Sequence, residues 1–180
     1  PPAPDPLIAQ LSSSPRAAYG RGDLRKAGQF YEQALQAARA RDDRAELPAI
    51  AANLAACRLA AGQTVGVAAL LAEARRERRQ AGQPTDDLDL LDASRLRAEG
   101  DVPGATATAR QVAATSANPA RVREAWQLVG LLAAKAGDAA GLADAFVDIN
   151  QGLPANAVRV TTNERGWLKE VRICLGKDFR

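Results

Sequence analysis

The chain has 180 residues, about the length of one domain, and 47% of them are apolar. Lysine and arginine exceed aspartate and glutamate by only 24 to 21, a weak and dispersed excess that speaks against a nucleic-acid-binding protein. No apolar run approaches the roughly 20 residues of a membrane span, and the absence of histidine excludes most hydrolytic designs and removes the commonest zinc ligand.

Small side chains dominate the apolar composition. Only seven residues are aromatic, namely three Phe, two Tyr and two Trp. Alanine fills stretches such as AIAANLAACRLAA, residues 49–61, where helices can approach one another closely. The composition therefore predicts an all-α fold.

Residues 1–7 begin with PPAPDP, which predicts an extended, proline-rich linker. A removed secretory signal, or a lipid-anchored cysteine just before Pro1, would leave such a tether on an envelope protein. An arbitrary start of the chain would leave the same sequence. We expect a periplasmic protein or an outer-membrane-anchored lipoprotein of the bacterial cell envelope, with the cytoplasm as the alternative.

Four glycines recur at similar intervals. Gly22, Gly62, Gly100 and Gly137 lie 37 to 40 residues apart, and each follows one helical apolar pattern and precedes another. Helices commonly end at a left-handed residue, and glycine adopts that conformation without penalty. Each glycine therefore predicts the turn of an αα-hairpin. A recurring hairpin predicts a solenoid in which each unit buries its open face on the next.

The fourth unit carries the most informative motif. It keeps the spacing of the pattern W-x2-L-G-x2-Y, A-x3-F and P, although the Tyr and the first Ala are replaced. The matching residues are Trp126, Val129, Gly130, Ala133, Leu142, Phe146 and Pro154. On these residues the chain resembles the tetratricopeptide repeat family. The resemblance implies a right-handed solenoid of about four repeats over residues 8–154.

The other three units match more loosely. The first supplies Ala27-x3-Tyr31-x2-Ala34, in which alanine admits the neighbouring helix and tyrosine fills the seam. The corresponding residues of the second and third units are Leu54, Ala55, Val67, Leu71, Ala74, Ala93, Leu96, Ala105 and Ala109. The intervals exceed the family's usual length of about 34 residues, and we expect longer second helices and loops to absorb the excess.

Residues 155–180 depart from the repeat. A helical apolar stripe at i, i+4, i+7 and i+8 is formed by Trp167, Val171, Cys174 and Leu175. We predict a linker and then a C-terminal helix that begins at Thr162 or Asn163 and ends at Gly176. Because a solenoid needs a terminal element over its last hairpin, we expect this helix to be the cap.

An acidic run follows Pro84 and Thr85, at a predicted helix start. It consists of Asp86, Asp87, Asp89 and Asp92. These residues lack the D-x-D-x-D-G spacing of a calcium loop, and carboxylates complement the dipole of a helix start. We therefore favour a capping role over a metal site, and we expect neither a metal nor a cofactor.

A basic run lies at the predicted end of a helix. It consists of Arg75, Arg76, Arg78 and Arg79. Cations complement the dipole at a helix end, and no aromatic residues interleave them. We favour a solvated helix end over a phosphate-binding patch.

Cys57 and Cys174 are the only cysteines. Cys57 lies within the second repeat and Cys174 near the C-terminus. A disulfide would need their Cα atoms within about 7 Å, so the solenoid would have to close on itself. We expect two buried free thiols.

The family resemblance also implies a binding surface, because the first helices of the family's hairpins line a concave groove. Carried over to this chain, that groove holds Ser12, Arg16, Tyr19, Ala52, Asn53, Ala56, Leu59, Leu90, Ser94, Arg97, Gln127, Leu131 and Lys135. The small residues leave room for a partner helix or an extended peptide, whose acidic groups would meet arginine. The alternative is that these residues mostly pack and that the convex side binds the partner.

We therefore expect a non-enzymatic protein–protein interaction scaffold or adaptor that binds a partner helix or peptide, of unknown identity, in this groove. Nucleic acid is not expected as a partner, and a membrane only through an upstream lipid anchor. The alternative is a peptide-sensing regulatory module associated with an enzyme or a transcription factor.

Overall fold

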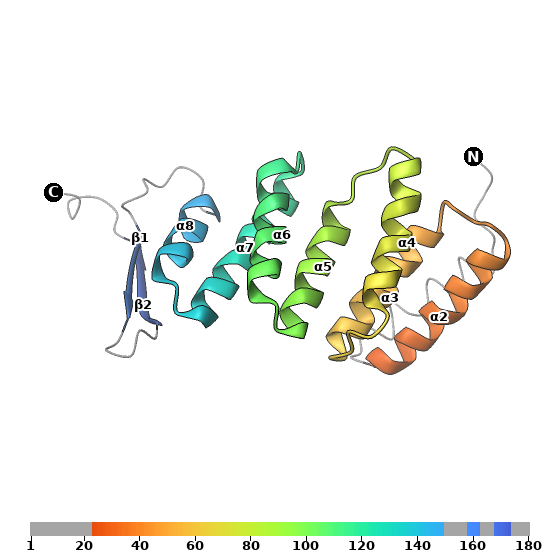
Figure 1. The fold of residues 1–180 in the computed structure, drawn as a ribbon, viewed down its shortest axis with the longest axis horizontal. Coiled ribbons are helices and arrows are strands. Elements are labelled where there is room, and N and C mark those ends of the chain that lie inside the picture. The colour runs from red at the N-terminus through yellow and green to blue at the C-terminus, as the bar shows by residue number, and fades with distance from the viewer. Residues whose placement is uncertain (1–22, 150–157, 163–167, 174–180) are drawn as a thin grey trace. The chain divides into compact units, whose positions relative to one another are not determined.

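The computed structural model describes residues 23–149, 158–162 and 168–173 of the chain, which forms two compact units, Pro1–Asp101 and Val102–Arg180 (Figure 1). The first unit holds α2 (Leu24–Ala40), α3 (Leu47–Ala60), α4 (Val67–Gln80) and α5 (Asp86–Glu99). The second holds α6 (Val102–Thr115), α7 (Pro119–Ala136), α8 (Ala139–Ile149), β1 (Val158–Thr162) and β2 (Leu168–Ile173).

Residues 24–149 confirm the predicted all-α fold, since seven helices and short connections account for that stretch. In the first unit α3 packs against α2 and α4, and α5 packs against both α3 and α4. In the second unit α7 packs against α6 and α8. Consecutive helices within each unit thus pack on one another as they do in a helical solenoid.

Three of the four predicted turn glycines have the expected backbone. Gly62, Gly100 and Gly137 have φ angles of 74°, 89° and 72°, in the left-handed region. The amides of Gly100 and Gly137 donate to carbonyls in the last turns of α5 and α7, and so end these helices. Gly22 lies outside the described residues.

The predicted seam on α2 is buried. Ala27 and Ala34 are fully buried, and Tyr31 is 4% exposed between them. Asp23 caps the start of the helix, because its side chain accepts a hydrogen bond of 3.1 Å from the amide of Lys26. Small residues on either side of one aromatic ring therefore form the inner face of α2.

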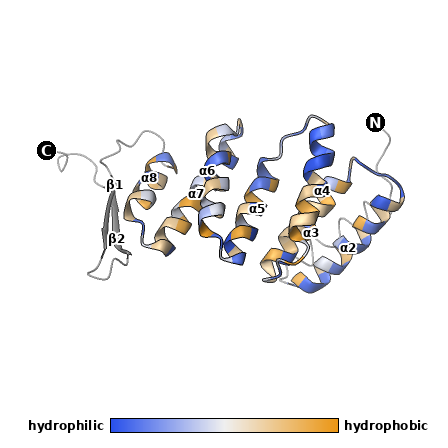
Figure 2. Cartoon of the chain, in the orientation of Figure 1, coloured by the Kyte–Doolittle hydropathy of each residue, from blue (hydrophilic) through white to orange (hydrophobic). Residues whose placement is uncertain are grey.

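The core of the first unit centres on α3, whose residues are apolar on almost every side. Ile50 and Leu54 of α3 are joined there by Leu71 of α4 and Leu88 of α5, all at most 2% exposed. Figure 2 shows hydrophobic residues along α3 and hydrophilic ones gathered at one end of α4. No helix among the described residues has both the length and the hydropathy that a membrane span needs.

Close helix packing in the second unit depends on Gly130. A Cβ atom added there would lie 3.3 Å from the Cβ of Ala145 and 3.6 Å from Cδ1 of Leu142. Glycine on α7 thus lets α8 approach closely, as the spacing of the fourth repeat predicts. Trp126, which opens the same motif, is only half-buried.

The predicted C-terminal helix is wrong. Val158–Thr162 and Leu168–Ile173 form an antiparallel pair of strands that aligns Val158 with Ile173 and Val160 with Val171. The sequence interpretation followed the helical spacing of the apolar residues and overlooked the β-branched ones, which alternate with polar residues in VRV and VRI. β-Branched residues at a period of two favour a strand.

The pair of strands lies next to the last described helix of the second unit, because β1 packs against α8 (Figure 1). The predicted capping helix is therefore replaced, in the described residues, by two strands. Most of the residues named for the predicted helix lie outside the described part of the chain. They are Asn163, Trp167, Cys174, Leu175 and Gly176.

Candidate functional site

The candidate groove residues of α3 and α5 lie on neighbouring helices, because α3 and α5 pack side by side in the first unit. Ala52 and Leu90 are 8% and 4% exposed. These two side chains belong to the packed interior, so they offer almost no surface to a partner. The structure corrects their predicted place in the groove floor, since each is surrounded by neighbouring side chains.

The remaining groove candidates of α3 and α5 are half-buried. They are Asn53, Ala56, Leu59, Ser94 and Arg97, and Leu59 packs against the core of the first unit. The side chains of Asn53, Ser94 and Arg97 form neither hydrogen bonds nor ion pairs with any described residue. Partly enclosed polar groups of this kind retain their full capacity for hydrogen bonding to a ligand.

The candidates of α7 form an open stripe on the second unit. Gln127, Leu131 and Lys135 follow one another at i, i+4 and i+8, and all three are exposed. Leu131 is 42% exposed. The three remaining candidates, Ser12, Arg16 and Tyr19, lie outside the described residues.

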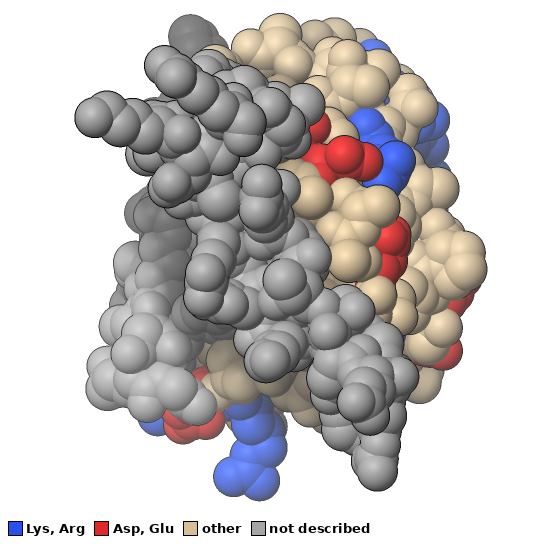
Figure 3. Space-filling view, turned by 90° about the vertical axis from the view of Figure 1, so that its left-hand side faces the viewer, with Lys and Arg blue, Asp and Glu red and all other residues tan. Residues whose placement is uncertain are grey.

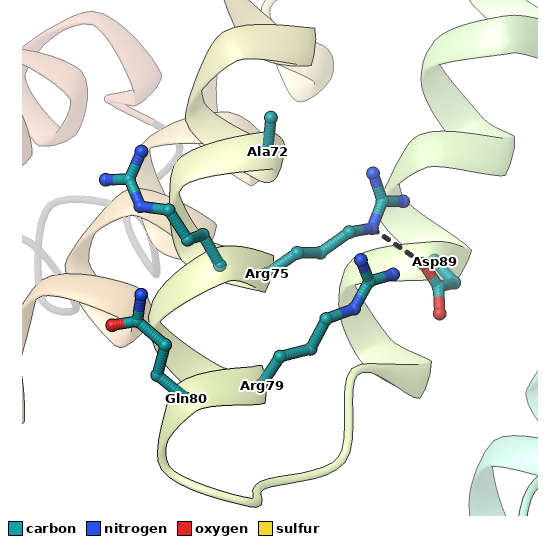
Figure 4. Close-up of a pocket in the computed structure, with 6 residues that line it drawn as sticks. Ala72, Arg75, Arg79, Gln80 and Asp89 are labelled. Atoms are coloured by element: carbon teal, nitrogen blue, oxygen red, sulfur yellow. Dashed lines mark hydrogen bonds and ion pairs between the residues drawn. The ribbon is translucent and has the colours of Figure 1, made fainter.

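The basic run of α4 and the acidic run of α5 pair with each other. Nε of Arg75 donates to Oδ1 of Asp89 at 2.7 Å, and Nη2 donates to Oδ2 of Asp92 at 2.9 Å. Figure 4 shows Arg75 reaching from α4 to Asp89 on α5. The side chains of Arg75 and Asp92 are only 18% and 19% exposed, so the pairs are partly screened from water.

Arg78 continues this network toward the turn. Its guanidinium makes a two-pronged contact with the carboxylate of Asp87, in which Nη2 lies 3.0 Å from Oδ2, and Nη1 also donates to the carbonyl of Pro84 at 3.2 Å. Arg95 pairs with Asp92 on its own helix at 2.7 Å. The clasp, as we call Arg75, Arg78, Asp87, Asp89 and Asp92, ties α4 to α5.

The clasp corrects the expectation of a solvated helix end, because Arg75 and Arg78 are only 18% and 17% exposed and form ion pairs with α5. The arginines do lie near the end of α4 and the aspartates near the start of α5, as predicted. Sequence reasoning missed their pairing, although a signal was present. In both runs the paired residues recur every two or three positions, so those of each run can lie on one side of their helix. A short turn separates the runs, and a short turn between two helices makes them antiparallel neighbours.

A second set of ion pairs ties α2 to its neighbours. Arg39 donates from Nε to Oε1 of Glu73 at 2.9 Å. This hydrogen bond lowers the pKa of the Glu73 carboxyl, against the opposing effect of partial burial, and raises the pKa of Arg39. Arg58 pairs with Glu32 at 2.7 Å. Both pairs line a cavity of about 460 Å³ between α2, α3 and α4, and Arg58 and Glu32 also line one of about 220 Å³ between α2 and α3.

One depression among those lined by described residues lies on α4 beside the clasp. Its volume is about 550 Å³, and its lining consists of Ala72, Arg75, Arg76, Arg79, Gln80 and Asp89 (Figure 4). Arg79 points in the same direction as Arg75 in this view, and its side chain has no partner among the described residues. The depression therefore combines one anchored and one unpaired guanidinium.

The described residues include no group of three His, Cys, Asp or Glu side chains that could hold a metal ion. Cys57 is a free thiol, 2% exposed, and burial raises its pKa.

In the face shown in Figure 3, the described basic and acidic side chains are interspersed among uncharged ones.

No protein-family model matches this chain, and neither a curated protein nor a solved structure is similar enough to it to count as a match. The tetratricopeptide resemblance therefore stays a prediction based on the repeat motif.

Proposed function

We propose that the chain is a non-enzymatic adaptor of the tetratricopeptide type that holds a protein partner, through a helix or an extended peptide, on the surface formed by α3 and α5. The contact surface is the α3/α5 face, which we define as Asn53, Ala56, Leu59, Ser94 and Arg97. Ala52 and Leu90 support this face from within.

One observation carries the proposal. Asn53, Ser94 and Arg97 are half-buried, yet their side chains make no polar contact within the described part of the protein. Elsewhere in the same unit arginines at similar depth are paired, as Arg58, Arg75 and Arg95 are. Half-buried donors without acceptors gain the most from a ligand that supplies them.

Apolar and small residues beside these donors suit a peptide ligand. Leu59 offers partial apolar surface, and Ala56 leaves room for a side chain of the partner. Arg97 can donate to a carboxylate of the partner with two parallel hydrogen bonds. We expect the preferred ligand to present an apolar residue and an acidic residue on the same side.

The experiment compares full-length variants as bait in pull-downs from membrane extracts, with the captured partner quantified. Arg97→Glu reverses the charge at the face, and Ser94→Arg blocks it sterically; both should reduce capture at least about tenfold, because like charges repel and a filled site excludes the ligand. Combining Arg97→Glu with Arg16→Glu should abolish the remaining capture.

The matched control is Arg110→Glu on α6, an exposed arginine without a partner among the described residues. This control should retain capture, and all variants should keep the parent's helical circular dichroism. If Arg97→Glu and Ser94→Arg both fold and still capture the partner as the parent does, the α3/α5 face is not the binding site.

We extend the proposal to the bacterial cell envelope, because the proline-rich composition of residues 1–7 suits an extended tether. Fractionation of the native source should then recover the protein in the periplasm or with membranes. Recovery in the cytosol alone would contradict this part of the proposal and leave the α3/α5 face untouched.

A further inference from the structure

The depression on α4 has the donors of an oxyanion site. Nε and Nη2 of Arg75 are engaged with α5, and these bonds fix the plane of the guanidinium. Its third nitrogen, Nη1, donates to no described residue. Arg75 thus presents a free donor group whose orientation is set in advance, which reduces the entropy lost on binding a ligand.

Two further guanidiniums border the same depression. Arg79 is exposed and makes no ion pair with the described residues, while Arg76, 62% exposed, pairs only through Nε with its sequence neighbour Glu77. Arg75 and Arg79 lie one helical turn apart and point the same way in Figure 4. Ala72, about one turn before Arg75, also lines the depression with its small side chain.

The charge balance decides which kind of partner fits. Three arginines and one aspartate line the depression, but Asp92 also pairs with Arg75, and Glu77 pairs with Arg76, so these carboxylates offset much of the positive charge. Long-range attraction is therefore weak, which disfavours a nucleic acid or a membrane surface, since these need broad positive patches. Short-range, paired hydrogen bonds to individual oxyanions are favoured.

We infer that the depression lined by Arg75, Arg76 and Arg79 is a second interaction site, which binds an acidic segment of a protein partner. Arg75 and Arg79 stand at i and i+4 on α4, where the Cβ atoms of a helix lie about 5–6 Å apart. Alternate side chains of an extended chain lie at a similar spacing, about 6.6 Å. Acidic residues at every second position of an extended segment can therefore engage both arginines together.

The site is independent of the α3/α5 face, because the two share no residue. A partner could thus be held by one surface or by both. Variants of the α3/α5 face should leave the acidic-segment site intact, so that the two proposals can fail separately.

The test is fluorescence anisotropy of the full chain with a fluorescein-labelled peptide that carries glutamate at every second position among serine and glycine, in low-salt buffer. The parent protein should bind the peptide saturably. Arg79→Glu should weaken binding at least about fivefold, because reversal of the unpaired charge repels the ligand. Arg76→Gln should weaken it less, since only one donor group is lost.

Arg25→Glu on α2 is the matched control. Arg25 is exposed and unpaired among the described residues of the same unit, and its reversal changes the net charge by the same amount. Binding within about twofold of the parent is expected for this variant and for Arg97→Glu. Equal weakening by Arg25→Glu and Arg79→Glu would show non-specific charge attraction and overturn the site, as would failure of the parent to bind.

A second arm identifies the oxyanion. The same peptide with phosphoserine in place of two glutamates, and inorganic phosphate as a competitor, are titrated in parallel. Tighter binding of the phosphopeptide, reversed by phosphate, would assign the site to phosphorylated segments, whereas unchanged or weaker binding would assign it to carboxylates. Binding of either peptide that is insensitive to Arg79→Glu contradicts the proposal.

Discussion

Arg75 and Asp89 join α4 to α5 through an ion pair of 2.7 Å across the turn at residues 81–85. The two side chains are 18% and 30% exposed, and Asp92 lies beside them as a second acceptor. A partly enclosed arginine shared by two carboxylates contributes more than a solvated surface pair, because removing it leaves two negative charges close together.

Arg75→Ala should therefore lower the free energy of unfolding by about 1–2 kcal/mol, because Asp89 and Asp92 each lose a charged hydrogen-bond donor while Thr85 and Arg95 remain as their other donors. The measurement is urea unfolding followed by circular dichroism. The loss should shrink when salt is raised, because counter-ions screen the exposed carboxylates.

Arg79→Ala is the control for this experiment, since Arg79 is exposed and unpaired on the same helix. Its stability should stay within about 0.5 kcal/mol of the parent's. An equal loss in both variants would mean that Arg75 acts through helix propensity or the helix dipole and not through the clasp.

Two helix-interior glycines should respond to alanine in opposite ways. At Gly28 on α2 nothing lies within 4 Å of an added Cβ, so Gly28→Ala should stabilise the protein by up to about 1 kcal/mol through helix propensity. At Gly130 the added Cβ meets the Cβ of Ala145 at 3.3 Å, and this atom is fixed to the backbone of α8. The clash should outweigh the propensity gain, for a net loss of about 1 kcal/mol.

Thermal and denaturant unfolding of the two glycine variants test this packing directly. A stabilised Gly130→Ala would show that α7 and α8 can move apart without cost. A destabilised Gly28→Ala would show that something packs against the open side of α2.

Glu73 should make stability sensitive to acid. Its pKa is lower in the folded protein than in the unfolded chain, chiefly because of the hydrogen bond from Arg39. Its contribution is therefore complete above the unfolded pKa, which is about 4.3, and is lost as the pH falls through the lower folded value. Glu73→Gln removes this dependence.

The measurement is the stability difference between parent and Glu73→Gln at several pH values. The difference should be largest near neutral pH and should fall as the pH drops from about 5 to about 3. A difference that stays constant over this range would mean that the pair does not couple folding to the ionisation of Glu73.

Trp126→Ala should cost less than the emptying of a fully buried aromatic site, which is about 3–5 kcal/mol. The indole is half-buried on α7, so we expect a loss of about 1–3 kcal/mol in urea unfolding. A larger loss would place Trp126 in the core, as the repeat motif alone suggests, and a loss below about 0.5 kcal/mol would leave it without a packing role.

The turns were predictable from the sequence because their requirement is local. A left-handed residue at a helix end strongly favours glycine, so Gly62, Gly100 and Gly137 mark helix ends without knowledge of tertiary contacts. The small seam residues Ala27 and Ala34 were predictable for a similar reason, since their spacing on one helical face is itself the signal.

The clasp and the C-terminal strands needed information that single segments do not hold. From the sequence of its own helix, Arg75 could equally well be hydrated by solvent. Only the turn that follows α4 brings Asp89 close enough to form the ion pair. Residues 158–173 carry helical and strand periodicities at once, and pairing between Val160 and Val171 favours the strand. The burial of Ala52 and Leu90, both assigned to an open groove, likewise depends on side chains from other elements.

The rate at which a thiol reagent labels Cys57 can report on local opening of the first unit. The Cys57 thiol is 2% exposed and borders the smaller cavity between α2 and α3, so a thiol reagent can reach it only when these helices separate. In a Cys174→Ser background, the labelling rate at a series of reagent concentrations would report how often that separation occurs and how quickly it reverses. Because Cys57 belongs to the first unit alone, the same reaction would reveal whether that unit opens while the helical signal of the rest of the chain persists.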